Sequence, residues 1–595
     1  MHHTATLEPE LCRRAALCIA VLRKTARSLR PLAFLAIFTG IFGPIVAEQA
    51  QDRSSGARIA DSIFENGKVF TAGERSGIAE AFAVKDGRFL AVGTSNAMRG
   101  YMGKGTAVVD LHGRTVTPGL SDGHFHNEGG GHGLDLSATR SLADLLAAVQ
   151  AAAKKARPGQ VIVSNSDWHE AQLREQRLPL AGELDAVSPS VPVVLVRGGH
   201  EMILNSAALR KWDITPNTKS PEGGSITRGP DGNLTGELID NARRLVKLPP
   251  APPVSMQDVL ETQRKLNAYG ITSVRIPGSY KGNLFQDYKL LKQMRDAGQL
   301  SLRYTIYLPG FATADPAKIR EMIVDSGLSQ DEGDEWVRIG GVKLLVDGGF
   351  EGGHMTRPYA EPYGKGGTFD GLTLVSLANF TAVVREVNRL GWRVATHAVG
   401  DAALDEVLDA YEAADAERSI AGKRWSIEHA FIARPNQIAR MKKLGVILSV
   451  QDHLYLAAPA MKKYWGIERA RTVTPLKTYL DNGFLVVGGT DSPVVPFNPF
   501  WELYHFNTRD TISDGVYGTD ERVESRETLL RMITINYARL TGEDKIKGSI
   551  EPGKLADFAI LSDDILTVPA KQMLQMKALA TYVGGKQVYH DPSYR

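Results

Sequence analysis

The sequence predicts an α/β fold, a (β/α)8 TIM-like barrel with an inserted subdomain, together with a small discontinuous β-sandwich domain built from both chain ends. Three observations predict it. Short, continuously apolar segments alternate with amphipathic segments through the middle of the chain, which is typical of a parallel sheet covered by helices. Both ends instead hold short alternating segments separated by glycine and Asn-Gly turns, which indicates β-hairpins. With 595 residues, 43% of them hydrophobic, the chain is long enough for both parts.

The first 47 residues differ from the rest and predict a signal peptide. Six basic side chains precede an uncharged apolar stretch at 31–47, a pattern typical of an export signal that is cleaved after Ala47. The alternative is an uncleaved membrane anchor, although the stretch is short and is interrupted by glycine and proline. Both cysteines lie in this segment, so the mature chain would hold none, which suits a protein of the bacterial periplasm.

The net charge argues against nucleic acid as a partner. Residues 1–47 carry six basic and two acidic side chains, a net charge of +4, and the whole chain carries +3, so about −1 is left for the remainder. The basic balance therefore belongs to the targeting segment. We expect a small-molecule substrate as the partner and, if the leader is cleaved, no membrane association, while a homo-oligomer stays an open alternative.

Residues 58–117 and 544–595 predict the two parts of one β-sandwich domain. The first part contains SIFENGKVFTA, AFAVKDGRFLAVG and TAVVDLHGRTVTPG, and the second contains KLADFAILS and LATYVGGKQVYH. These segments share the same strand-and-turn texture and flank a middle of different character. We therefore expect the two ends of the chain to meet in space.

Residues 118–543 predict the barrel. One strand precedes the motif GHFH, and the other seven are expected at 270–278, 302–310, 337–349, 393–400, 424–430, 446–454 and 485–493. Amphipathic stretches such as LANFTAVVREVNRLG, DAALDEVLDAYEAA and NQIARMKKLG lie between them, and eight such units indicate a (β/α)8 barrel. The gap between the first two strands is too long for one helix, so we expect an inserted subdomain at about 128–260.

A histidine pair at the end of the first strand predicts metal binding. In TVTPGLSDGHFHN, His124 and His126 are two residues apart, and residues i and i+2 of a strand point to the same face. Two imidazoles placed in this way could bind one divalent ion. Taken alone, such a pair is more often part of a polar surface than a metal site.

The ends of the later strands supply the remaining candidates. In such barrels the reactive groups lie at the carboxyl ends of the strands. Lys343 is expected in or near the end of the fourth strand, His397 on the fifth, His429 on the sixth and Asp491 on the eighth. Neutral imidazoles bind zinc or a similar ion, and a carboxylate can both bind the ion and accept a proton. Together these residues predict a metal site.

These residues lie in motifs that resemble the amidohydrolase superfamily, in particular a branch similar to N-substituted formamide deformylases. The resemblance covers about 62–589 and is carried by NGKVFTA, TVTPGLSDGHFH, GHEMILNSAAL, GITSV, VKLLVDG, THAVGDAALD, SIEHA, GGTDSPV and IEPGKLADFAIL. It implies a cofactor of one or two divalent ions, with zinc preferred. It also implies a ligand set of His124, His126, His397, His429 and Asp491, with Asp491 also the catalytic proton carrier.

Lys343 is a special case among the implied ligands. A protonated lysine has only donors and cannot bind a metal, but the resemblance implies carboxylation by CO₂ to a carbamate that bridges two ions. The alternative is an ordinary ion pair with Asp347 or with a substrate carboxylate. The sequence then departs from the branch, because VKLLVDG is followed by GFEGGHMTRPY where relatives usually have a Ser-Gly-Ser-Arg-like run.

Three further residues are candidates for substrate binding. His200 lies in the motif of the inserted subdomain and could reach the substrate or the metal from above, although a structural role there is equally consistent. Arg357 follows the altered run after the fourth strand. His453 ends the seventh strand and faces the barrel mouth by register, which favours a substrate-side or packing role over metal binding.

The predicted function is that of a metal-dependent enzyme that hydrolyses a C–N bond other than a peptide bond, in an N-substituted formamide, amide or carbamate. Metal-activated water would attack the carbonyl, and Asp491 would carry its proton to the departing nitrogen. One alternative is hydrolysis of an N-acyl amino acid, a cyclic amide or an ester. A different alternative is a non-catalytic barrel used for binding, against which the intact set of candidate ligands argues.

Overall fold

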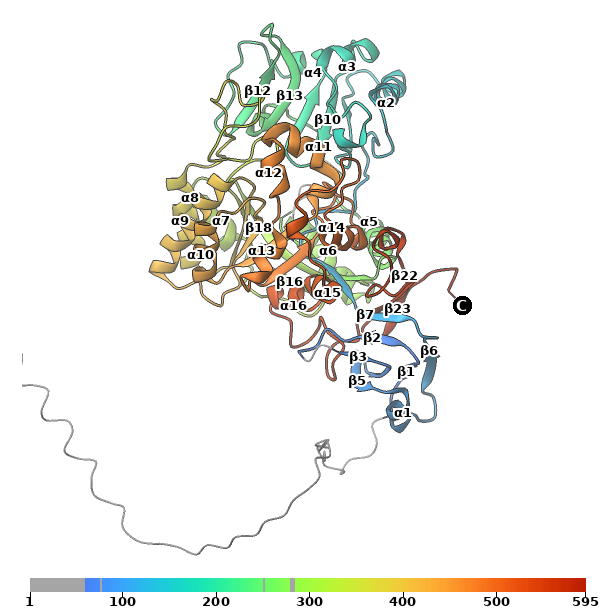
Figure 1. Ribbon diagram of the computed structural model, residues 1–595. Helices are drawn as coiled ribbons and strands as arrows, with labels where there is room; N and C mark the ends of the chain where they lie inside the picture. Colours follow the sequence, from blue (N-terminus) through green and yellow to red (C-terminus); the bar gives the residue numbers. More distant parts are fainter. Residues whose placement is uncertain (1–58, 75–76, 250–251, 279–283, 595) are drawn as a thin grey trace, which may run out of the picture. The chain divides into compact units, whose positions relative to one another are not determined.

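The computed structural model describes residues 59–594 apart from 75–76, 250–251 and 279–283 (Figure 1). The predicted signal peptide, residues 1–47, lies outside the described residues. The chain from Ala57 to Arg595 forms one compact unit. In the described ranges, no helix combines the length and the apolar character that a membrane crossing requires.

Eight parallel strands form the barrel and confirm the predicted fold class. In hydrogen-bonded order they run β8, β14, β15, β16, β17, β18, β19 and β20. The sheet is closed where the Gly123 amide donates to the Gly488 carbonyl at 2.9 Å and Phe125 pairs with Ser492. The strands span Leu120–Asp122, Ile271–Ile276, Arg303–Phe311, Val337–Leu345, Val394–Ala398, Ser426–His429, Ile447–Gln451 and Val486–Gly489 in that order.

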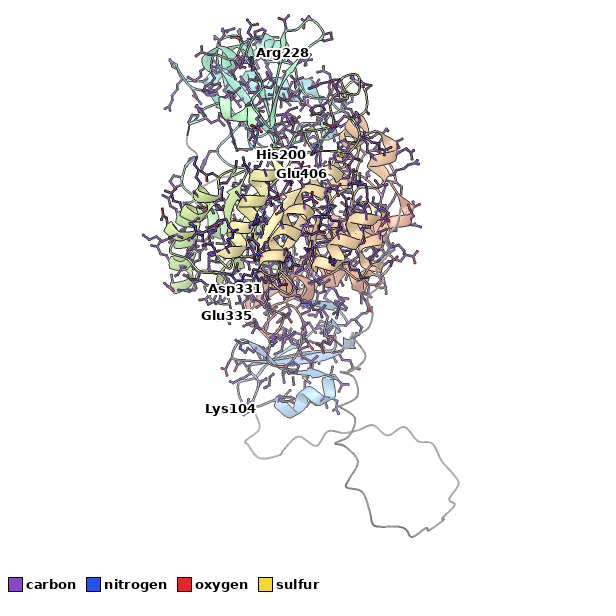
Figure 2. The ribbon with its side chains drawn as sticks, turned by 90° about the vertical axis from the view of Figure 1, so that its left-hand side faces the viewer. Lys104, His200, Arg228, Asp331, Glu335 and Glu406 are labelled. Carbon is purple, nitrogen blue, oxygen red and sulfur yellow. The ribbon has the colours of Figure 1, made fainter. Side chains whose placement is uncertain are left out.

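Helices surround the barrel, and their apolar faces explain the packing. In α8 (Leu377–Arg389), Phe380, Val383, Val384 and Val387 are buried, the i, i+3, i+4, i+7 spacing of one helical face. The other helices of this region are α5 (Met256–Asn267), α6 (Leu284–Asp296), α7 (Pro316–Asp325), α9 (Asp401–Glu417), α10 (Pro435–Leu444), α11 (His453–Trp465), α12 (Ile467–Arg471), α13 (Leu476–Asp481), α14 (Pro499–Thr508), α15 (Arg526–Met532) and α16 (Ile535–Thr541). Figure 2 shows His200 and Glu406 at one end of this region and Asp331 at the other.

Two sheets at the side of the barrel join the two ends of the chain, as the sequence predicts. Strands β7 and β21 pair antiparallel, and aromatic rings of both chain ends share one core, as in the edge-to-face pair Phe82 and Phe558. One sheet has the order β5-β4-β1-β6 and the other β23-β22-β21-β7-β2-β3. The strands are β1 (Ser62–Glu65), β2 (Lys68–Phe70), β3 (Ile78–Ala79), β4 (Ala81–Lys85), β5 (Arg88–Gly93), β6 (Ala107–Asp110), β7 (Thr115–Pro118), β21 (Phe558–Leu561), β22 (Ala578–Val583) and β23 (Lys586–His590).

A five-stranded sheet lies between β8 and β14 in the sequence, in the region where an inserted subdomain is predicted. Its order is β12-β13-β11-β10-β9, and the loop that follows β10 brings His200 to the mouth of the barrel. Its elements are α2 (Leu142–Lys155), β9 (Ile162–Val163), α3 (Ala181–Val187), β10 (Val193–Arg197), β11 (Glu201–Leu204), α4 (Ser206–Lys211), β12 (Gly224–Arg228) and β13 (Leu234–Asp240). The domain boundaries themselves stay predictions.

A buried ion pair between the barrel and the β-domain gives a test of their coupling. Arg303 on β15 donates to the Asp557 carboxylate through Nε at 2.6 Å and Nη2 at 2.9 Å. Asp557→Ala leaves a buried guanidinium without this partner, so we expect the free energy of unfolding to fall by about 3–5 kcal/mol. Urea denaturation measures it, with Lys571→Ala at an exposed position as the control. Equal midpoints for the two variants would contradict the coupling.

Candidate metal centre

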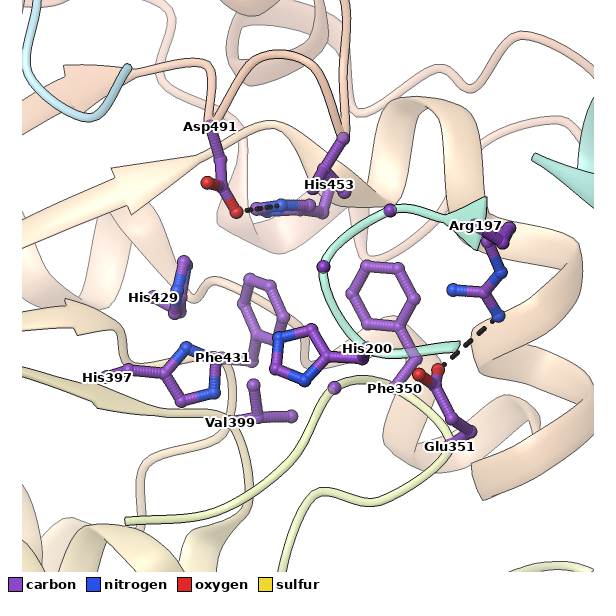
Figure 3. A pocket seen from close by; sticks show the side chains of 14 residues that line it. Arg197, His200, Phe350, Glu351, His397, Val399, His429, Phe431, His453 and Asp491 are labelled. Carbon is purple, nitrogen blue, oxygen red and sulfur yellow. Dashed lines mark hydrogen bonds and ion pairs between the residues drawn. The ribbon is translucent and has the colours of Figure 1, made fainter. Parts of the chain in front are cut away.

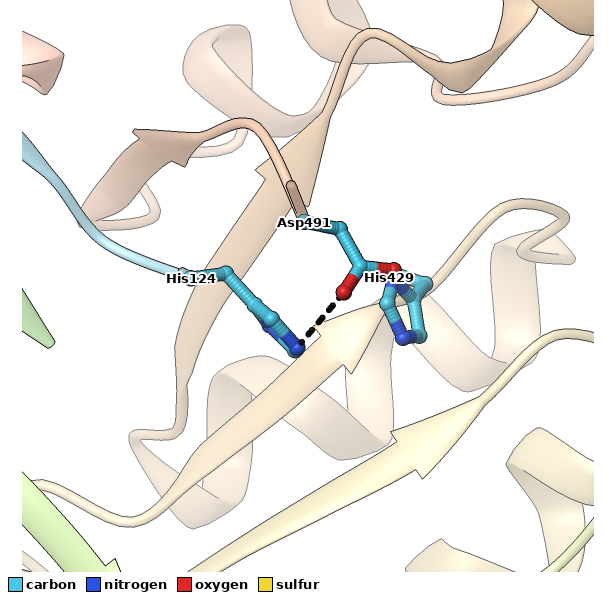
Figure 4. A group of neighbouring side chains, drawn as sticks. All are labelled: His124, His429 and Asp491. Carbon is cyan, nitrogen blue, oxygen red and sulfur yellow. Dashed lines mark ion pairs between the residues drawn. The ribbon is translucent and has the colours of Figure 1, made fainter. Parts of the chain in front are cut away.

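Two imidazoles and a carboxylate meet at the carboxyl ends of the barrel strands. His124, His429 and Asp491 each offer a ligand atom, and these atoms all lie within 4.8 Å of one another (Figure 4). The His124 Nε2 atom is 3.5 Å from Asp491 Oδ1. All three side chains are buried. This is the donor set and spacing that a zinc-like ion requires.

The backbone holds these residues just beyond the strands. Strand β8 ends at Asp122, so His124 and His126 follow the strand, and the prediction that they lie on one strand face is wrong. Their rings nevertheless lie together, with centroids 5.2 Å apart. The Asp122 Oδ1 atom accepts the His124 amide at 3.0 Å and holds the segment in place. A Cβ on Gly489 would lie 2.4 Å from that same amide nitrogen, so glycine permits β20 to approach this closely.

Two of the three site residues adopt backbone conformations that are unusual for their type. His429 has a φ of 72° and Asp491 a φ of 59°, in the left-handed region that non-glycine residues rarely adopt. Such residues persist where the surrounding structure over-determines them, and they cluster at functional sites. The conformations therefore support a functional role for this pair.

His126 and His397 complete the predicted ring of histidines. The His126 Nε2 atom lies 3.0 Å from Asp491 Oδ1, and the His397 ring centroid lies 4.6 Å from that of His429. All five predicted ligands other than lysine are thus brought to one place. His124, His429 and Asp491 are the tightest subset, with His126 and His397 next to them.

Each of the four histidines uses one ring nitrogen for a hydrogen bond to an acceptor, which leaves the other nitrogen for a metal. This arrangement fixes the tautomer and orientation of a metal-binding imidazole. The acceptors are the Glu428 carboxylate for His124 Nδ1 (2.8 Å), the Gln451 amide oxygen for His429 Nδ1 (2.6 Å), the Gly278 carbonyl for His126 Nδ1 (3.1 Å) and the Gly348 carbonyl for His397 Nε2 (3.1 Å).

Burial keeps the imidazoles of His124, His397 and His429 neutral, as metal binding requires. It lowers the pKa of His124 to about 3, and it lowers the pKa of His397 and His429 well below the usual histidine range. Burial alone would raise the pKa of Asp491, but the neighbouring histidines outweigh it and hold that pKa well below its usual value. The residues present therefore fit a divalent cation, with neutral nitrogen donors and an ionised carboxylate.

Lys343 lies at the same centre, on β16. Its Nζ atom is 3.3 Å from His124 Nε2, and burial lowers its pKa to about 8. Asp347, the alternative ion-pair partner, accepts the backbone amides of Val399 and Gly400 instead, at 3.1 and 2.8 Å. In the described part of the chain, no ion pair joins Lys343 to Asp347, so that alternative is not supported.

A small cavity opens above the centre, between the strand ends and the inserted subdomain (Figure 3). His200 and His453, both predicted at the substrate, line it, and His453 Nε2 donates to Asp491 Oδ2 at 3.1 Å. Arg357, the third prediction, is exposed and is not among the lining residues. The lining residues that the sequence did not reveal include Arg197, Phe350, Glu351 and Phe431.

Comparisons with known proteins agree with this geometry. The profile of the amidohydrolase family matches residues 107–589. Protein LONG AFTER FAR-RED 3 of Arabidopsis thaliana is 32% identical and covers 89% of this chain and 92% of its own length. N-substituted formamide deformylase of Arthrobacter pascens is 29% identical over 89% of this chain and 98% of its own. The crystal structure of an uncharacterized metal-dependent hydrolase from Pyrococcus furiosus is 27% identical, with a TM-score of 0.60 over 85% of this chain and 100% of that one.

The hydrogen bond from His429 to Gln451 gives a test of the metal centre. Gln451→Met keeps the size of the side chain but removes the acceptor that orients the imidazole, so we expect the affinity for zinc to fall by about 10–100-fold. Competition with a chromophoric chelator measures the affinity. Gln437→Met is the matched control, because Gln437 is equally buried but donates to the Asp401 carbonyl in another part of the barrel. Unchanged affinity in Gln451→Met would contradict the assigned centre.

Proposed function

The chain belongs to the amidohydrolase family, and from this premise we propose that it is a metal-dependent enzyme that hydrolyses a C–N bond other than a peptide bond. The observation that carries the proposal is the buried group of His124, His429 and Asp491, in which every imidazole is oriented and neutral. The deformylase relative supports an N-substituted formamide, an amide or a carbamate as the substrate class. Zinc is the proposed ion.

The chain's own residues define what the site can do. When bound, a divalent ion would supply Lewis-acid polarisation of the carbonyl and activation of water. His124, His126, His397, His429 and Asp491 would hold it. The cavity would bind the substrate so that its carbonyl lies against this centre.

Asp491 is placed to carry the proton. Its Oδ1 atom faces His124 and His126, and its Oδ2 atom accepts a hydrogen bond from His453, so the carboxylate is held in one orientation at the cavity wall. It would accept a proton from the attacking water and deliver it to the nitrogen that leaves. An amine is a poor leaving group unless it is protonated, so this transfer is needed for the C–N bond to break.

Lys343 is the residue through which a second ion could be held. Its neutral amine would attack CO₂, forming an N–C bond and releasing one proton, and the resulting carbamate would offer two oxygen ligands. Its depressed pKa favours the neutral amine that this reaction needs.

The setting of the enzyme is also proposed. The basic and apolar pattern of residues 1–47 supports export to the bacterial periplasm.

The proposal is tested by screening the zinc- or manganese-loaded protein against a formamide, an amide, a carbamate, an N-acyl amino acid, a cyclic amide and an ester. We expect metal-dependent hydrolysis of at least one of the first three. A preference for one of the last three would favour the alternative enzymatic function. No hydrolysis of any member, together with less than about one ion per chain, would favour a binding protein.

Replacement of the proton carrier gives a sharper test. Asp491→Asn keeps the shape of the side chain but cannot accept the proton, so we expect kcat to fall by about 10²–10⁴-fold. Metal content and the thermal midpoint are measured alongside. Asp331→Asn, at the opposite end of the barrel (Figure 2), is the control with normal turnover. Near-normal kcat in metal-loaded Asp491→Asn would refute the assigned role.

Carboxylation of Lys343 is tested by carbon-13 NMR of the metal-free protein in labelled bicarbonate, with zinc added afterwards. We expect a carbamate resonance that is absent from Lys343→Met. Only the neutral amine reacts, and it reacts with CO₂, so at a fixed concentration of dissolved CO₂ the initial rate should rise about tenfold per pH unit below the pKa of about 8 and level off above it. A spectrum identical to that of Lys343→Met would exclude the carbamate.

A further inference from the structure

We propose that the cavity selects substrates whose far end carries a cation, an ammonium or amidinium group, and that Glu351 binds this group. The proposal rests on the proposed function, because it names the substrate class for the same site. It is carried by a buried cluster of carboxylates at the end of the cavity away from Asp491 (Figure 3).

Three carboxylates surround a single guanidinium in this cluster. The Arg197 Nε atom is 3.0 Å from Glu170 Oε2, and its Nη2 atom is 2.6 Å from Glu201 Oε2 and 3.4 Å from Glu351 Oε2. At most 4% of any of these four side chains is exposed. Buried charges are normally paired one to one, because an unpaired buried charge is strongly destabilising. The cluster therefore has room for a second cation.

The three carboxylates do not share Arg197 equally. Burial raises the pKa of each, but at Glu170 the guanidinium and the His169 ring together outweigh burial, and the pKa is lowered. At Glu351 and Glu201 the effect of burial is larger than that of the guanidinium, and both pKa values are raised. Arg197 therefore stabilises the negative charge of Glu170 most, and the negative charge of an ionised Glu351 is less well compensated.

Glu351 is the member of the three that faces the cavity. It lines the cavity, whereas Glu170 and Glu201 do not. Its Oε1 atom is buried and has no hydrogen-bond partner among the described residues. A Cβ on Gly349 would lie 2.9 Å from this oxygen and 2.8 Å from His200 Cγ, so only glycine lets the backbone pass this close to the carboxylate. A substrate N–H donor would satisfy the unpaired oxygen.

The path from the metal centre to Glu351 suits an apolar chain that ends in a cation. Phe350 and Phe431 form an aromatic wall with ring centroids 5.9 Å apart, and aromatic faces attract cations as well as alkyl groups. His200 lies over His397 with centroids 5.4 Å apart, and its Nδ1 atom is 2.6 Å from Asp240 Oδ1. Asp240 is therefore the hydrogen-bond partner of His200, and His200 also lowers the pKa of Glu351, after the larger effect of Arg197.

An anionic far end is disfavoured by the same contacts. Arg197 and His200 line the cavity and could bind a carboxylate, but Arg197 is surrounded by Glu170, Glu201 and Glu351, and His200 is paired with Asp240. A substrate carboxylate would meet the Glu351 oxygen and add a like charge in a buried site. Glu351 also belongs to GFEGGHM, the run in which the sequence departs from the family branch that it resembles. The substrate is thus expected to differ from that branch at its far end.

Three formamides of matched length test the proposal: N-(4-aminobutyl)formamide as the cation, N-pentylformamide as the neutral analogue and 5-formamidopentanoate as the anion. A charge-assisted hydrogen bond to Glu351 should raise kcat/KM of the cation about tenfold or more over that of the neutral compound. Glu351→Gln should reduce this preference to about threefold or less.

Glu201→Gln is the matched control, because it alters the same cluster at a residue that does not line the cavity. It should keep the preference for the cation. Isothermal titration of the same three compounds into metal-free protein gives a readout that needs no turnover, and it should show the same order.

The outcomes separate the two proposals. Hydrolysis of the formamides with no preference for the cation would overturn the role of Glu351 and leave the proposed function standing. Cation binding that depends on Glu351, without any hydrolysis, would overturn the proposed function and leave the role of Glu351 standing. A preference for the anion, or equal losses in Glu351→Gln and Glu201→Gln, would overturn the assignment of the cation to Glu351.

Discussion

The site depends on one ion pair in the middle of the barrel. Arg275 on β14 donates to both oxygens of Glu428 on β18, at 2.8 and 2.9 Å, and Glu428 in turn accepts from His124. Both side chains are fully buried, so the pair costs desolvation and is a poor source of stability by itself. The pair orients the segment that carries His124, because Arg275 also donates a hydrogen bond to the Gly123 carbonyl. The barrel interior is therefore a polar scaffold for one imidazole.

Sequence patterns were sufficient for the strands and for the residues at their ends. Continuous apolar runs located the barrel strands, and the strand-end rule then gave His397, His429 and Asp491 without knowledge of any contact. The ion pair between Arg275 and Glu428 was not predicted, although the sequence contains a sign of it. Arg275 and Glu428 are charged residues inside otherwise apolar strands, in GITSVRIPG and RWSIEHA. Since charges are rarely buried unless paired, two such residues predict each other.

The cavity wall was harder to predict, for a physical reason. Phe350 and Phe431 follow different strands, and Arg197 comes from the inserted sheet, so their meeting depends on how far each loop folds over the barrel. Periodicity describes regular elements and carries no information about such loops. Arg357 shows the converse, since it follows a promising motif but is exposed and does not line the cavity. The end of β8 at Asp122 was also missed, because residue pattern alone does not fix where a strand ends.

The division between strand ends and loops also separates chemistry from specificity in this molecule. The proposed metal ligands lie in or directly after the eight barrel strands, and each strand is held in place by hydrogen bonds to its neighbours. A reaction centre requires rigid support of this kind. The segments around His200 and Glu351 lie outside those strands and can change without disturbing the barrel. Similarity to relatives at about 30% identity is therefore stronger evidence for the type of reaction than for the substrate. The charge of the cavity wall is the better guide to what this chain binds.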